Sequence, residues 1–330
     1  MHRRTVRLKN LDLNLLVALD VLLAERNVSR AAERVHITQS AMSNALARLR
    51  DYFGDDLLIK VGRRFALTPR ADLLREPVRD ILVRVESSVM ARPVFDPAAS
   101  ERTFRIYVSD YSLTTLVPRF LSLVAPRASR ARFDFRPQTD QPLRTLERGE
   151  ADLLIIPAPF TGEGHPSEAL YEEGFVCIAD VRHPRIGKSL TRAAFQRERH
   201  AVMQPPGNAS SFETEALRKL GITRDADVTT FSFASLPYLV AGTERLATIH
   251  MRTAQRVAEY LPLRILKLPF EIPAMRQSLQ WHAYRSSDPA IVWLRQTMHA
   301  AARLLEAAHS HAERPQGSVG RDAGSSPGRA

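Results

Sequence analysis

The 330-residue chain contains a single cysteine, Cys177, and no apolar run that approaches the ~20 residues a membrane-spanning helix needs. One cysteine cannot form a disulfide within the chain, so nothing favours an oxidising compartment, and we interpret Cys177 as a core residue. The basic start of the chain leads into a segment interrupted by Asp12, Asn14 and Asp20, which lacks the apolar centre of a signal peptide. These absences predict a soluble, cytoplasmic protein.

Catalytic and metal-binding patterns are also missing. The ten histidines are scattered and lack the spacing that metal ligands require, so we expect no metal. Gly187-Lys188-Ser189 resembles the end of a phosphate-binding loop, but Arg182 occupies the position of its required glycine. Ser210, Ser211 and Asp110 have no recognisable nucleophile context. The sequence therefore predicts neither an enzyme nor a cofactor.

What the chain does contain is positive charge, concentrated at its start. Its length allows two or more globular units, and 44% hydrophobic residues can form sizeable cores. Residues 1–70 hold thirteen lysines and arginines against seven acidic residues, which is over half of the net charge of +11. Such a concentration favours a polyanionic partner, so we expect this part of the chain to face nucleic-acid phosphates.

Two short helices joined by a tight turn are predicted between Val28 and Arg50. Ser29 is expected to cap the first helix and Thr38 the second, and small residues in the first helix let the two cross closely. Opposite its apolar side, the second helix carries side chains of the kinds that read base edges in a major groove: Gln39, Ser40, Ser43, Asn44 and Arg48. An ordinary helical hairpin on a protein surface is the alternative.

The flanking segments complete this unit. Upstream, Asp12 can cap an apolar helix whose inward-facing residues are Leu15, Leu19, Leu22 and Leu23. Downstream, residues 55–70 are typical of two short strands around Gly62-Arg63-Arg64, a wing with a basic tip. We expect Gln39, Ser40, Ser43 and Asn44 to contact bases, and Arg48, Arg63 and Arg64 to contact phosphates or the minor groove.

The order of these motifs resembles the LysR-type bacterial transcriptional regulators. The resemblance rests on Leu-Asp-Leu-Asn-Leu-Leu at 11–16, Ala31-Ala32, Thr-Gln-Ser-Ala-Met-Ser at 38–43 and Leu-Thr-Pro-Arg-Ala at 67–71. Within the family, residues 11–16, Ser40 and residues 51–56 resemble the NodD-like branch of nodulation regulators. The resemblance to LysR-type regulators implies a winged helix-turn-helix domain at 1–68, in which Ser29, Arg30 and Thr38 also lie at the DNA. It further implies promoter binding as a dimer or tetramer, with RNA polymerase as a partner.

A long helix is expected after Thr68, with Pro69 at the tolerated first position. Within it, four apolar residues step by four, three and four, the spacing of a coiled-coil seam: Leu74, Val78, Ile81 and Val85. We interpret residues 69–90 as a dimerisation helix, with packing against its own chain as the alternative. Pro77 is expected to kink or shorten it. Residues 91–100 are the predicted hinge.

Residues 101–308 alternate between strands and helices, which predicts an α/β fold with parallel pairing. The predicted strands are 104–108, 132–137, 153–156, 175–179, 200–203, 228–231, 245–249 and 263–268, and the helices are 113–124, 143–148, 211–220, 252–259 and 290–306. The LysR resemblance implies two Rossmann-like subdomains around an effector cleft, joined by two crossing strands, as in periplasmic binding proteins. Residues 309–330 are rich in Gly, Ser, Pro and Arg and are expected to be disordered.

The resemblance places the effector where strands meet helix starts. The residues expected around it are Ser109, Asp110, Tyr111, Ser112, Thr114, Pro157, Ala158 and Phe160, and opposite them Met203, Gln204, Phe233, Ser235, Thr248, Ile249 and His250. A helix start favours anions, but the charge of Asp110 opposes one, and the aromatic residues offer apolar surface. We therefore predict a small, largely uncharged aromatic effector. The alternative is that Asp110 only caps its helix and the aromatic residues are core.

The leading hypothesis is a DNA-binding transcriptional regulator controlled by a small molecule. A solute-binding protein would share the second domain, but it would need export and would have no use for residues 11–70. An enzyme would need a catalytic set that the sequence lacks. Whether the chain activates or represses transcription stays open.

Overall fold

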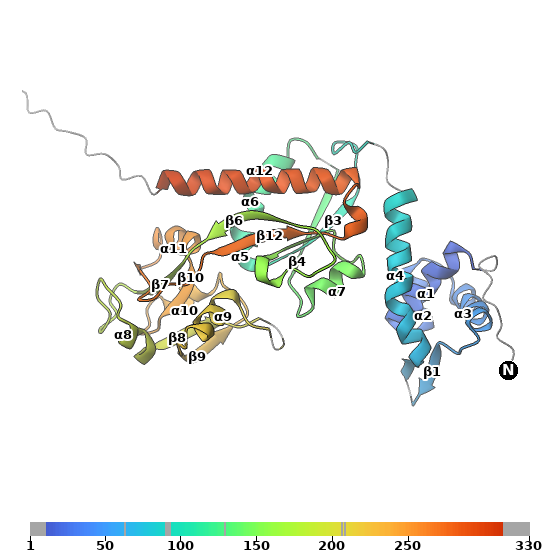
Figure 1. Ribbon diagram of the computed structural model, residues 1–330, viewed down its shortest axis with the longest axis horizontal. Helices are drawn as coiled ribbons and strands as arrows, with labels where there is room; N and C mark the ends of the chain where they lie inside the picture. Colours follow the sequence, from blue (N-terminus) through green and yellow to red (C-terminus); the bar gives the residue numbers. More distant parts are fainter. Residues whose placement is uncertain are drawn as a thin grey trace, which may run out of the picture.

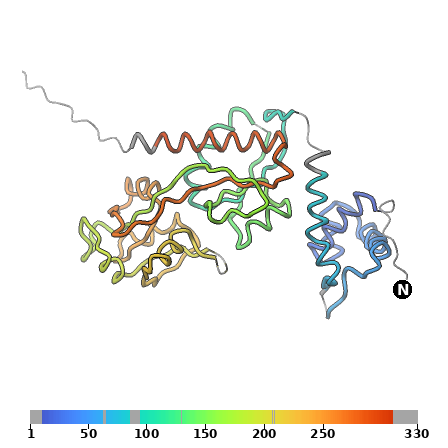
Figure 2. Tube along the Cα trace, viewed as in Figure 1, coloured from blue at the N-terminus to red at the C-terminus, as the bar shows by residue number. Residues whose placement is uncertain are grey.

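The computed structural model describes residues 11–62, 64–89, 94–128, 130–205, 207 and 209–312. A small helical unit lies at one end, and the long helix α4 (Pro69–Val89) separates it from a larger α/β part (Figure 1). The trace in Figure 2 shows that α4 comes between the two parts in sequence as well as in space. The predicted fold class, α/β with an N-terminal winged helix-turn-helix, is confirmed.

Three helices and a hairpin make the N-terminal unit. They are α1 (Leu13–Glu25), α2 (Val28–Arg34) and α3 (Gln39–Phe53), followed by β1 (Leu58–Val61) paired with β2 (Arg64–Leu67). Leu19, Ala31, Met42 and Leu49 are all 0% exposed between these helices. Because Ala31 is fully enclosed, a larger side chain there would separate α2 from its neighbours.

Side-chain caps fix where these helices begin. Asp12 and Thr38 each accept a hydrogen bond from the backbone N–H three residues ahead, at 2.8 and 3.2 Å, as predicted. α2 begins differently, because Asn27 accepts the N–H of Arg30 at 3.1 Å. The prediction of Ser29 as this cap is wrong, since Ser29 lies inside α2.

α4 runs through Pro77 without ending there. The hydroxyl of Thr68 accepts the N–H of Ala71 at 3.0 Å, and Pro69 is the first helical residue, as predicted. Pro77 removes one helical hydrogen bond, but it lies on the exposed side, where water can pair with the carbonyl of Leu73. Pro77 therefore does not shorten the helix.

The four residues of the predicted dimerisation seam do not share an accessible face. Val78 is 3% exposed and Leu74 is half-buried, and both pack into the core of the N-terminal unit. Val85 is half-buried, whereas Ile81 is 46% exposed and Leu73, two turns before it, is 78% exposed. The seam is wrong for Leu74 and Val78, because α4 uses that face to close its own domain.

The first subdomain of the α/β part is built on a five-stranded sheet in the order β4-β3-β5-β12-β6. The strands are β3 (Thr103–Val108), β4 (Arg132–Pro137), β5 (Leu153–Pro157), β6 (Ser167–Glu173) and β12 (Met275–Gln280). The helices are α5 (Asp110–Thr115), α6 (Val117–Val124), α7 (Pro142–Glu147) and α12 (Pro289–Ala312), with the single turns η2 (Ala158–Phe160) and η3 (Ala283–Arg285). α12 lies along α6 and β6 and covers one face of the subdomain (Figure 1).

The second subdomain contains the sheet β10-β7-β11 and the strand pair β8-β9. The strands are β7 (Phe175–Asp180), β8 (Arg199–Met203), β9 (Asp225–Thr230), β10 (Ala247–His250) and β11 (Leu263–Leu266), and the helices are α8 (Arg192–Arg197), α9 (Phe212–Lys219), α10 (Leu236–Val240) and α11 (Met251–Ala258). The chain enters the second subdomain through Gly174, between β6 and β7, and returns to the first subdomain between β11 and β12. Cys177 is buried in its core, and burial raises the pKa of this thiol to about 12.

Strand pairing is only partly parallel. β3 pairs in parallel with β4 and β5, and β8 with β9, whereas β12 and the pairs within β10-β7-β11 are antiparallel. The expectation of parallel pairing throughout is therefore wrong. The predicted helix 113–124 is two helices, α5 and α6, because the chain turns at Leu116 ahead of Pro118.

Two predicted boundaries also move. α12 continues to Ala312, so the predicted end of the effector domain at 308 falls inside this helix. Residues 313–330 of the predicted tail and 91–93 of the predicted hinge lie outside the described residues. Later in the hinge, the ring of Phe95 lies 6.0 Å from Phe104 and 5.2 Å from Trp293, so this part packs onto the first subdomain.

Candidate functional site

One side of α3 is exposed along its length. The exposed polar residues include the five predicted to read DNA, Gln39, Ser40, Ser43, Asn44 and Arg48, and one acidic residue further along the helix, Asp51. Thr38, the cap, is exposed as well, and its hydroxyl oxygen lies 3.0 Å from that of Ser40. Because these positions are one, three or four residues apart, their side chains leave neighbouring turns on the same side. The surface they form presents hydrogen-bond donors and acceptors on one side of a helix, the kind of element that a DNA major groove admits.

Two arginines beside this surface are held only by exposed contacts. Arg30 donates to the carbonyl oxygen of Glu25 at 3.0 Å, next to the half-buried Ser29 on α2. Arg48 pairs with Asp12 at 3.4 Å, with 61% and 51% of the two side chains exposed. Exposed ion pairs contribute little stability, so either guanidinium can exchange its contact for a phosphate.

The hairpin that follows projects as the predicted wing. Gly62 turns the chain at φ +60°, in the left-handed region that glycine adopts without strain. The backbone of Arg64 pairs with Val61, and Lys60 is exposed on the other strand. Arg63 and the side chain of Arg64 lie outside the described part of the chain.

A cavity of about 640 Å³ lies between the two subdomains, at the ends of β3 and β5 on one side and of β8 and β9 on the other. Its volume suits a small organic molecule. Of the fifteen residues predicted around an effector, eight line this cleft: Ser109, Asp110, Tyr111, Pro157, Phe160, Met203, Phe233 and His250.

The remaining seven predicted residues lie outside the lining: Ser112, Thr114, Ala158, Gln204, Ser235, Thr248 and Ile249. Ile249 is 0% exposed in the core, and the hydroxyl of Ser112 accepts a hydrogen bond from Gln277 at 3.0 Å. Their placement in the lining is wrong, because neighbouring residues on a strand or helix point to different sides.

The carboxylate of Asp110 joins the two subdomains. One of its oxygens accepts hydrogen bonds from the Ser232 hydroxyl at 2.7 Å and from the Ala234 backbone N–H at 2.9 Å. We call this contact the Asp110 joint. The helix cap is a different residue, Ser109, whose hydroxyl accepts the N–H of Ser112 at 3.3 Å. Asp110 therefore acts across the cleft and not as a cap.

Aromatic rings form one wall of the cleft. Tyr111 stacks on His250 with ring centroids 3.8 Å apart, and Phe233 meets His250 edge-on at 4.6 Å. The Tyr111 hydroxyl donates to Glu173. Burial raises the pKa of Tyr111 well above its ordinary value and lowers the pKa of His250 to about 3. This wall is therefore uncharged near neutral pH.

Acidic side chains line the cleft, but lysine and arginine are absent from the lining formed by the described residues. The acidic residues are Asp110, Asp140 and Glu213, and burial raises the pKa of the Glu213 carboxyl. Glu213 Oε2, Gln277 Oε1 and His250 Nδ1 have no hydrogen-bond partner in the described chain. These buried atoms leave the cleft with unused hydrogen-bonding capacity and no cation for a carboxylate.

Residues 13–72 match the family described as bacterial regulatory helix-turn-helix proteins of the lysR family, and residues 97–303 match the LysR substrate binding domain. The chain belongs to the LysR family of bacterial transcriptional regulators. It is 36% identical over 313 residues to Nodulation protein D of Bradyrhizobium sp. (strain ANU 289), covering 94% of this chain and 92% of that protein. Nodulation protein D 1 of Rhizobium leguminosarum bv. phaseoli is 38% identical, covering 92% and 97%.

Solved structures share this architecture. The probable transcriptional regulator PA0477 from Pseudomonas aeruginosa superposes with a TM-score of 0.61 at 29% identity, covering 89% of this chain and 98% of that chain. CbnR, solved with its target DNA, has a TM-score of 0.56 at 15% identity, covering 89% and 100%, and shows the fold alone. LysR-family membership accounts for both halves of the chain as a DNA-binding regulator that responds to an effector. A solute-binding protein accounts for only one half.

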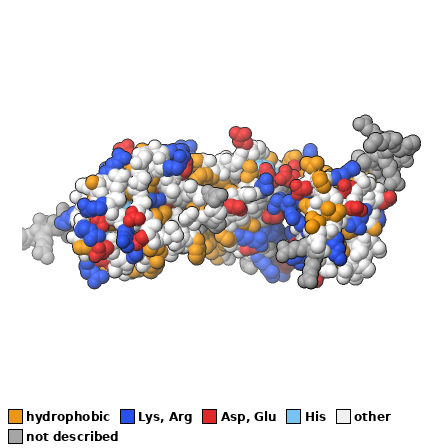
Figure 3. All heavy atoms as spheres, turned by 90° about the horizontal axis from the view of Figure 1, so that it is seen from below, with side chains coloured by type: hydrophobic (Ala, Val, Ile, Leu, Met, Phe, Trp, Pro, Cys, Tyr) orange, Lys and Arg blue, Asp and Glu red, His pale blue; other side chains and the backbone are white. Residues whose placement is uncertain are grey.

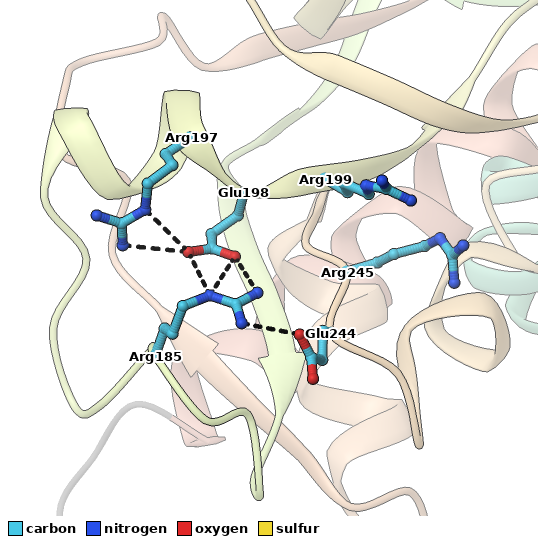
Figure 4. A pocket seen from close by; sticks show the side chains of 6 residues that line it. All are labelled: Arg185, Arg197, Glu198, Arg199, Glu244 and Arg245. Carbon is cyan, nitrogen blue, oxygen red and sulfur yellow. Dashed lines mark hydrogen bonds and ion pairs between the residues drawn. The ribbon is translucent and has the colours of Figure 1, made fainter.

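A second hollow, of about 500 Å³, lies on the surface of the second subdomain, where Arg185, Arg197, Arg199 and Arg245 gather (Figure 4). Glu198 accepts hydrogen bonds from Arg185 and Arg197, and Arg185 also pairs with Glu244 at 2.9 Å. Arg199 and Arg245 both pair with Asp227, at 3.5 and 2.9 Å. Figure 3 shows basic and acidic side chains interspersed at this end of the molecule. The arginines are thus engaged by carboxylates, and this hollow is separate from the cleft between the subdomains.

Many of the residues that line the cleft were not predicted, and the three that bear most on its chemistry are Phe231, Glu213 and Gln277. Phe231 directly follows β9 and is 82% exposed, so an apolar residue at a strand's carboxyl end was the available signal. Glu213 lies in the first turn of α9, where acidic residues are common at any helix start. Gln277 lies in β12, a strand whose polar sequence gave no strand pattern.

Within the described ranges, no group of three or more His, Cys, Asp or Glu residues could hold a metal ion. None of the helices that can be described has both the length and the apolar character to cross a membrane.

Proposed function

We propose that this LysR-family regulator controls transcription in response to a small, uncharged aromatic molecule bound in the cleft. The observation that carries the proposal is the charge of the lining, with three carboxyl groups and, among the described residues, no lysine or arginine. A carboxylate ligand would lose its hydration there without gaining a cation.

A cationic ligand is not favoured either. Asp110 is already engaged in the Asp110 joint. The raised pKa of the Glu213 carboxyl favours its neutral form, and Asp140 is exposed, where water screens its charge. The cleft is therefore best matched by a neutral molecule.

Aromatic side chains on both subdomains support a flat, apolar ligand. Phe160 follows β5 and is 40% exposed, and Phe231 follows β9 and is 82% exposed, and both line the cleft. A ring placed against them would cover apolar surface that now faces water. Hydroxyl groups on that ring could donate to Gln277 Oε1 and Glu213 Oε2, which lack partners in the described chain.

For DNA, we propose two roles along the exposed N-terminal surface. The first role is contact with bases, by Gln39, Ser40, Ser43 and Asn44. The second is contact with phosphates or the minor groove, by Arg48, Arg63 and Arg64, with Ser29, Arg30 and Thr38 at the DNA backbone beside them. The exposure of the α3 residues supports the first role. We further propose that the protein works in the cytoplasm as a dimer or tetramer and activates transcription by contacting RNA polymerase.

The test of the effector class compares ligands that share a phenol ring and carry a neutral, an anionic or a cationic substituent opposite the hydroxyl group. The full chain is heated with methyl 4-hydroxybenzoate, 4-hydroxybenzoate or tyramine, and the shift in Tm is measured. The same measurement is made with naphthols, which have two rings, that carry the same three substituents. We expect the neutral esters to raise Tm more than their charged counterparts, because binding to the folded state stabilises it.

Two variants locate the binding. Phe231→Ala should reduce the shift caused by the esters, whereas Tyr238→Ala, an aromatic residue 58% exposed and outside the lining, should leave it unchanged. A shift produced only by the carboxylates, and undiminished in Phe160→Ala and Phe231→Ala, would contradict the proposal.

A further inference from the structure

We infer that Arg79 is a positioning residue that fixes the DNA-binding unit against the regulatory domain, and that α7 connects the cleft to it. The role of Arg79 does not depend on which effector the regulator binds. The second half rests on the cleft proposed above as the effector site.

The guanidinium of Arg79 makes contact in two directions. Its Nη1 lies 2.6 Å from Asp20 Oδ2 on α1, with 22% and 16% of the two side chains exposed, so the pair is largely shielded from water. Its Nε donates to the carbonyl oxygen of Arg148, in the turn between α7 and β5. One side chain on α4 therefore ties the DNA-binding unit to the first regulatory subdomain.

The backbone beside Arg148 packs directly on α4. Gly149 has φ +61°, and a Cβ added to it would lie 2.6 Å from Val83 Cγ2 and 3.7 Å from Arg79 Nη2. One position further along α4, the guanidinium of Arg84 lies over the Tyr284 ring, 5.3 Å from its centroid. α4 is thus docked on the regulatory domain along one side, and Figure 1 shows α7 next to it.

α7 spans the distance between the cleft and this docking contact. Its first residue, Pro142, lines the cleft, and Arg148 directly follows its last residue. Six helical residues rise ~9 Å and move as one body. Leu146 anchors the helix at 0% exposure, and the Thr145 hydroxyl lies 3.2 Å from that of Thr139 in the cleft wall. A displacement of this wall is therefore passed to the carbonyl that Arg79 binds.

The test measures one distance within the full chain and needs no ligand, so it does not depend on the proposed effector class. Spin labels are attached to cysteines introduced at two exposed positions, Ala24 on α1 and Ser122 on α6 in the first subdomain. Cys177 is 0% exposed and stays unlabelled. Labelled protein is diluted with unlabelled protein so that distances within one chain dominate, and their distribution is measured by double electron–electron resonance.

The substitution at Arg79 has a matched control on the same helix. Arg79→Lys keeps a cation for Asp20 but loses the planar donor set that reaches Arg148, so we expect a broader distance distribution. Arg75→Lys makes the same chemical change where the arginine pairs only with the exposed Asp72, at 3.4 Å, and should give the wild-type distribution. A narrow, wild-type distribution in Arg79→Lys would overturn the positioning role.

A second set of variants tests the contact from the other side. Gly149→Ala should also broaden the distribution, because its methyl group displaces Val83 and because φ +61° strains an alanine. Val83→Ala in the same chain removes only the clash and should narrow the distribution part of the way. Thr139→Val removes the hydroxyl that links the cleft wall to α7. It should broaden the distance distribution when Arg79 is present, and it should cause no further broadening in a chain that already carries Arg79→Lys. If Thr139→Val leaves the distribution unchanged while Arg79→Lys broadens it, the route through α7 is wrong and the role of Arg79 stands.

Discussion

Asn44 and Arg48 lie one turn apart on the exposed face of α3, yet they offer different chemistry to DNA. The amide of Asn44 can donate and accept at once, which suits a base edge, whereas the guanidinium of Arg48 suits a phosphate. Arg48 also has a local carboxylate, Asp12 at 3.4 Å, which a DNA phosphate would have to replace.

Substituting these two residues should separate the two kinds of contact. Asn44→Ala is expected to change the preferred bases at one position of the operator, at ~1–3 kcal/mol per lost contact. Arg48→Ala should weaken all sequences equally and reduce the salt slope of log Kobs by about 1. Binding to a randomised operator library at several salt concentrations measures both effects. A changed base preference with an unchanged salt slope in Arg48→Ala would show that its assignment is wrong.

Most helix caps could be predicted from sequence, apart from that of α2, whereas partnerships between residues far apart in the chain could not. The capping roles of Asp12, Thr38 and Thr68 depend on residues three positions away, so the sequence contains them. Asp110 was placed at the cleft, but its partners lie 122 and 124 residues further along the chain. No local pattern reports that pairing, because it exists only once the two subdomains have folded together.

At the scale of elements, α4 shows why a helical repeat is ambiguous. One spacing fits two arrangements equally well, a seam with a helix of a second chain or an apolar stripe packed on the same domain. This spacing is that of Leu74, Val78, Ile81 and Val85. The structure uses Val78 for the second purpose and leaves Leu73 and Ile81 outside. These two exposed residues are the apolar surface on α4 that a second chain could cover.

A charge at Ile81 should therefore weaken self-association. Ile81→Asp would place a carboxylate in the interface formed with a second chain, where burying it without a partner is costly, and light scattering should report a lower mass. Ile81→Val, which keeps an apolar contact, is the matched control and should retain the wild-type mass. An unchanged mass for Ile81→Asp would exclude Ile81 from the interface.

In the five-stranded sheet, the strands with a clear apolar pattern were predicted within a few residues, and the two most polar strands were missed. β5 (Leu153–Pro157) is entirely buried or half-buried and was found, whereas β6 (Ser167–Glu173) carries five acidic or hydroxyl side chains and was not. β12 was missed for the same reason. Both missed strands pair antiparallel to each other, so the mixed direction of the sheet could not be inferred without them.

At the scale of the whole molecule, buried histidines make stability depend on pH. Burial lowers the pKa of His200 to about 4, of His250 to about 3 and of His282 to about 4. An unfolded chain binds protons on these rings near pH ~6.5, and the folded chain does not. The free energy of unfolding is therefore not reduced by these rings above pH ~6.5. It decreases as the pH falls from there toward the pKa values of the folded protein.

The expected change can be measured for one residue. Between about pH 7.5 and about pH 5.5, each such histidine should cost about 1.4 kcal/mol in the free energy of unfolding. Urea denaturation of His250→Gln should show a pH dependence smaller by this amount than wild type. The raised pKa of Glu213 acts in the opposite direction but is common to both proteins. His36→Asn alters an exposed residue with φ 56°, which asparagine also adopts, and should keep the wild-type dependence.

The Asp110 joint has a consequence for how fast the regulator can respond. Separating the subdomains at this point breaks both of its hydrogen bonds together, so the separated form is a minor population. For an effector too large to pass through the closed cleft, opening of the joint limits the rate of association and also the rate of release. The time for which the regulator stays switched after its effector is withdrawn then depends on one carboxylate on α5 together with the other contacts that join the subdomains, such as Arg256 Nη1 to the Thr114 carbonyl oxygen at 2.8 Å, whatever the concentration at which the effector was sensed.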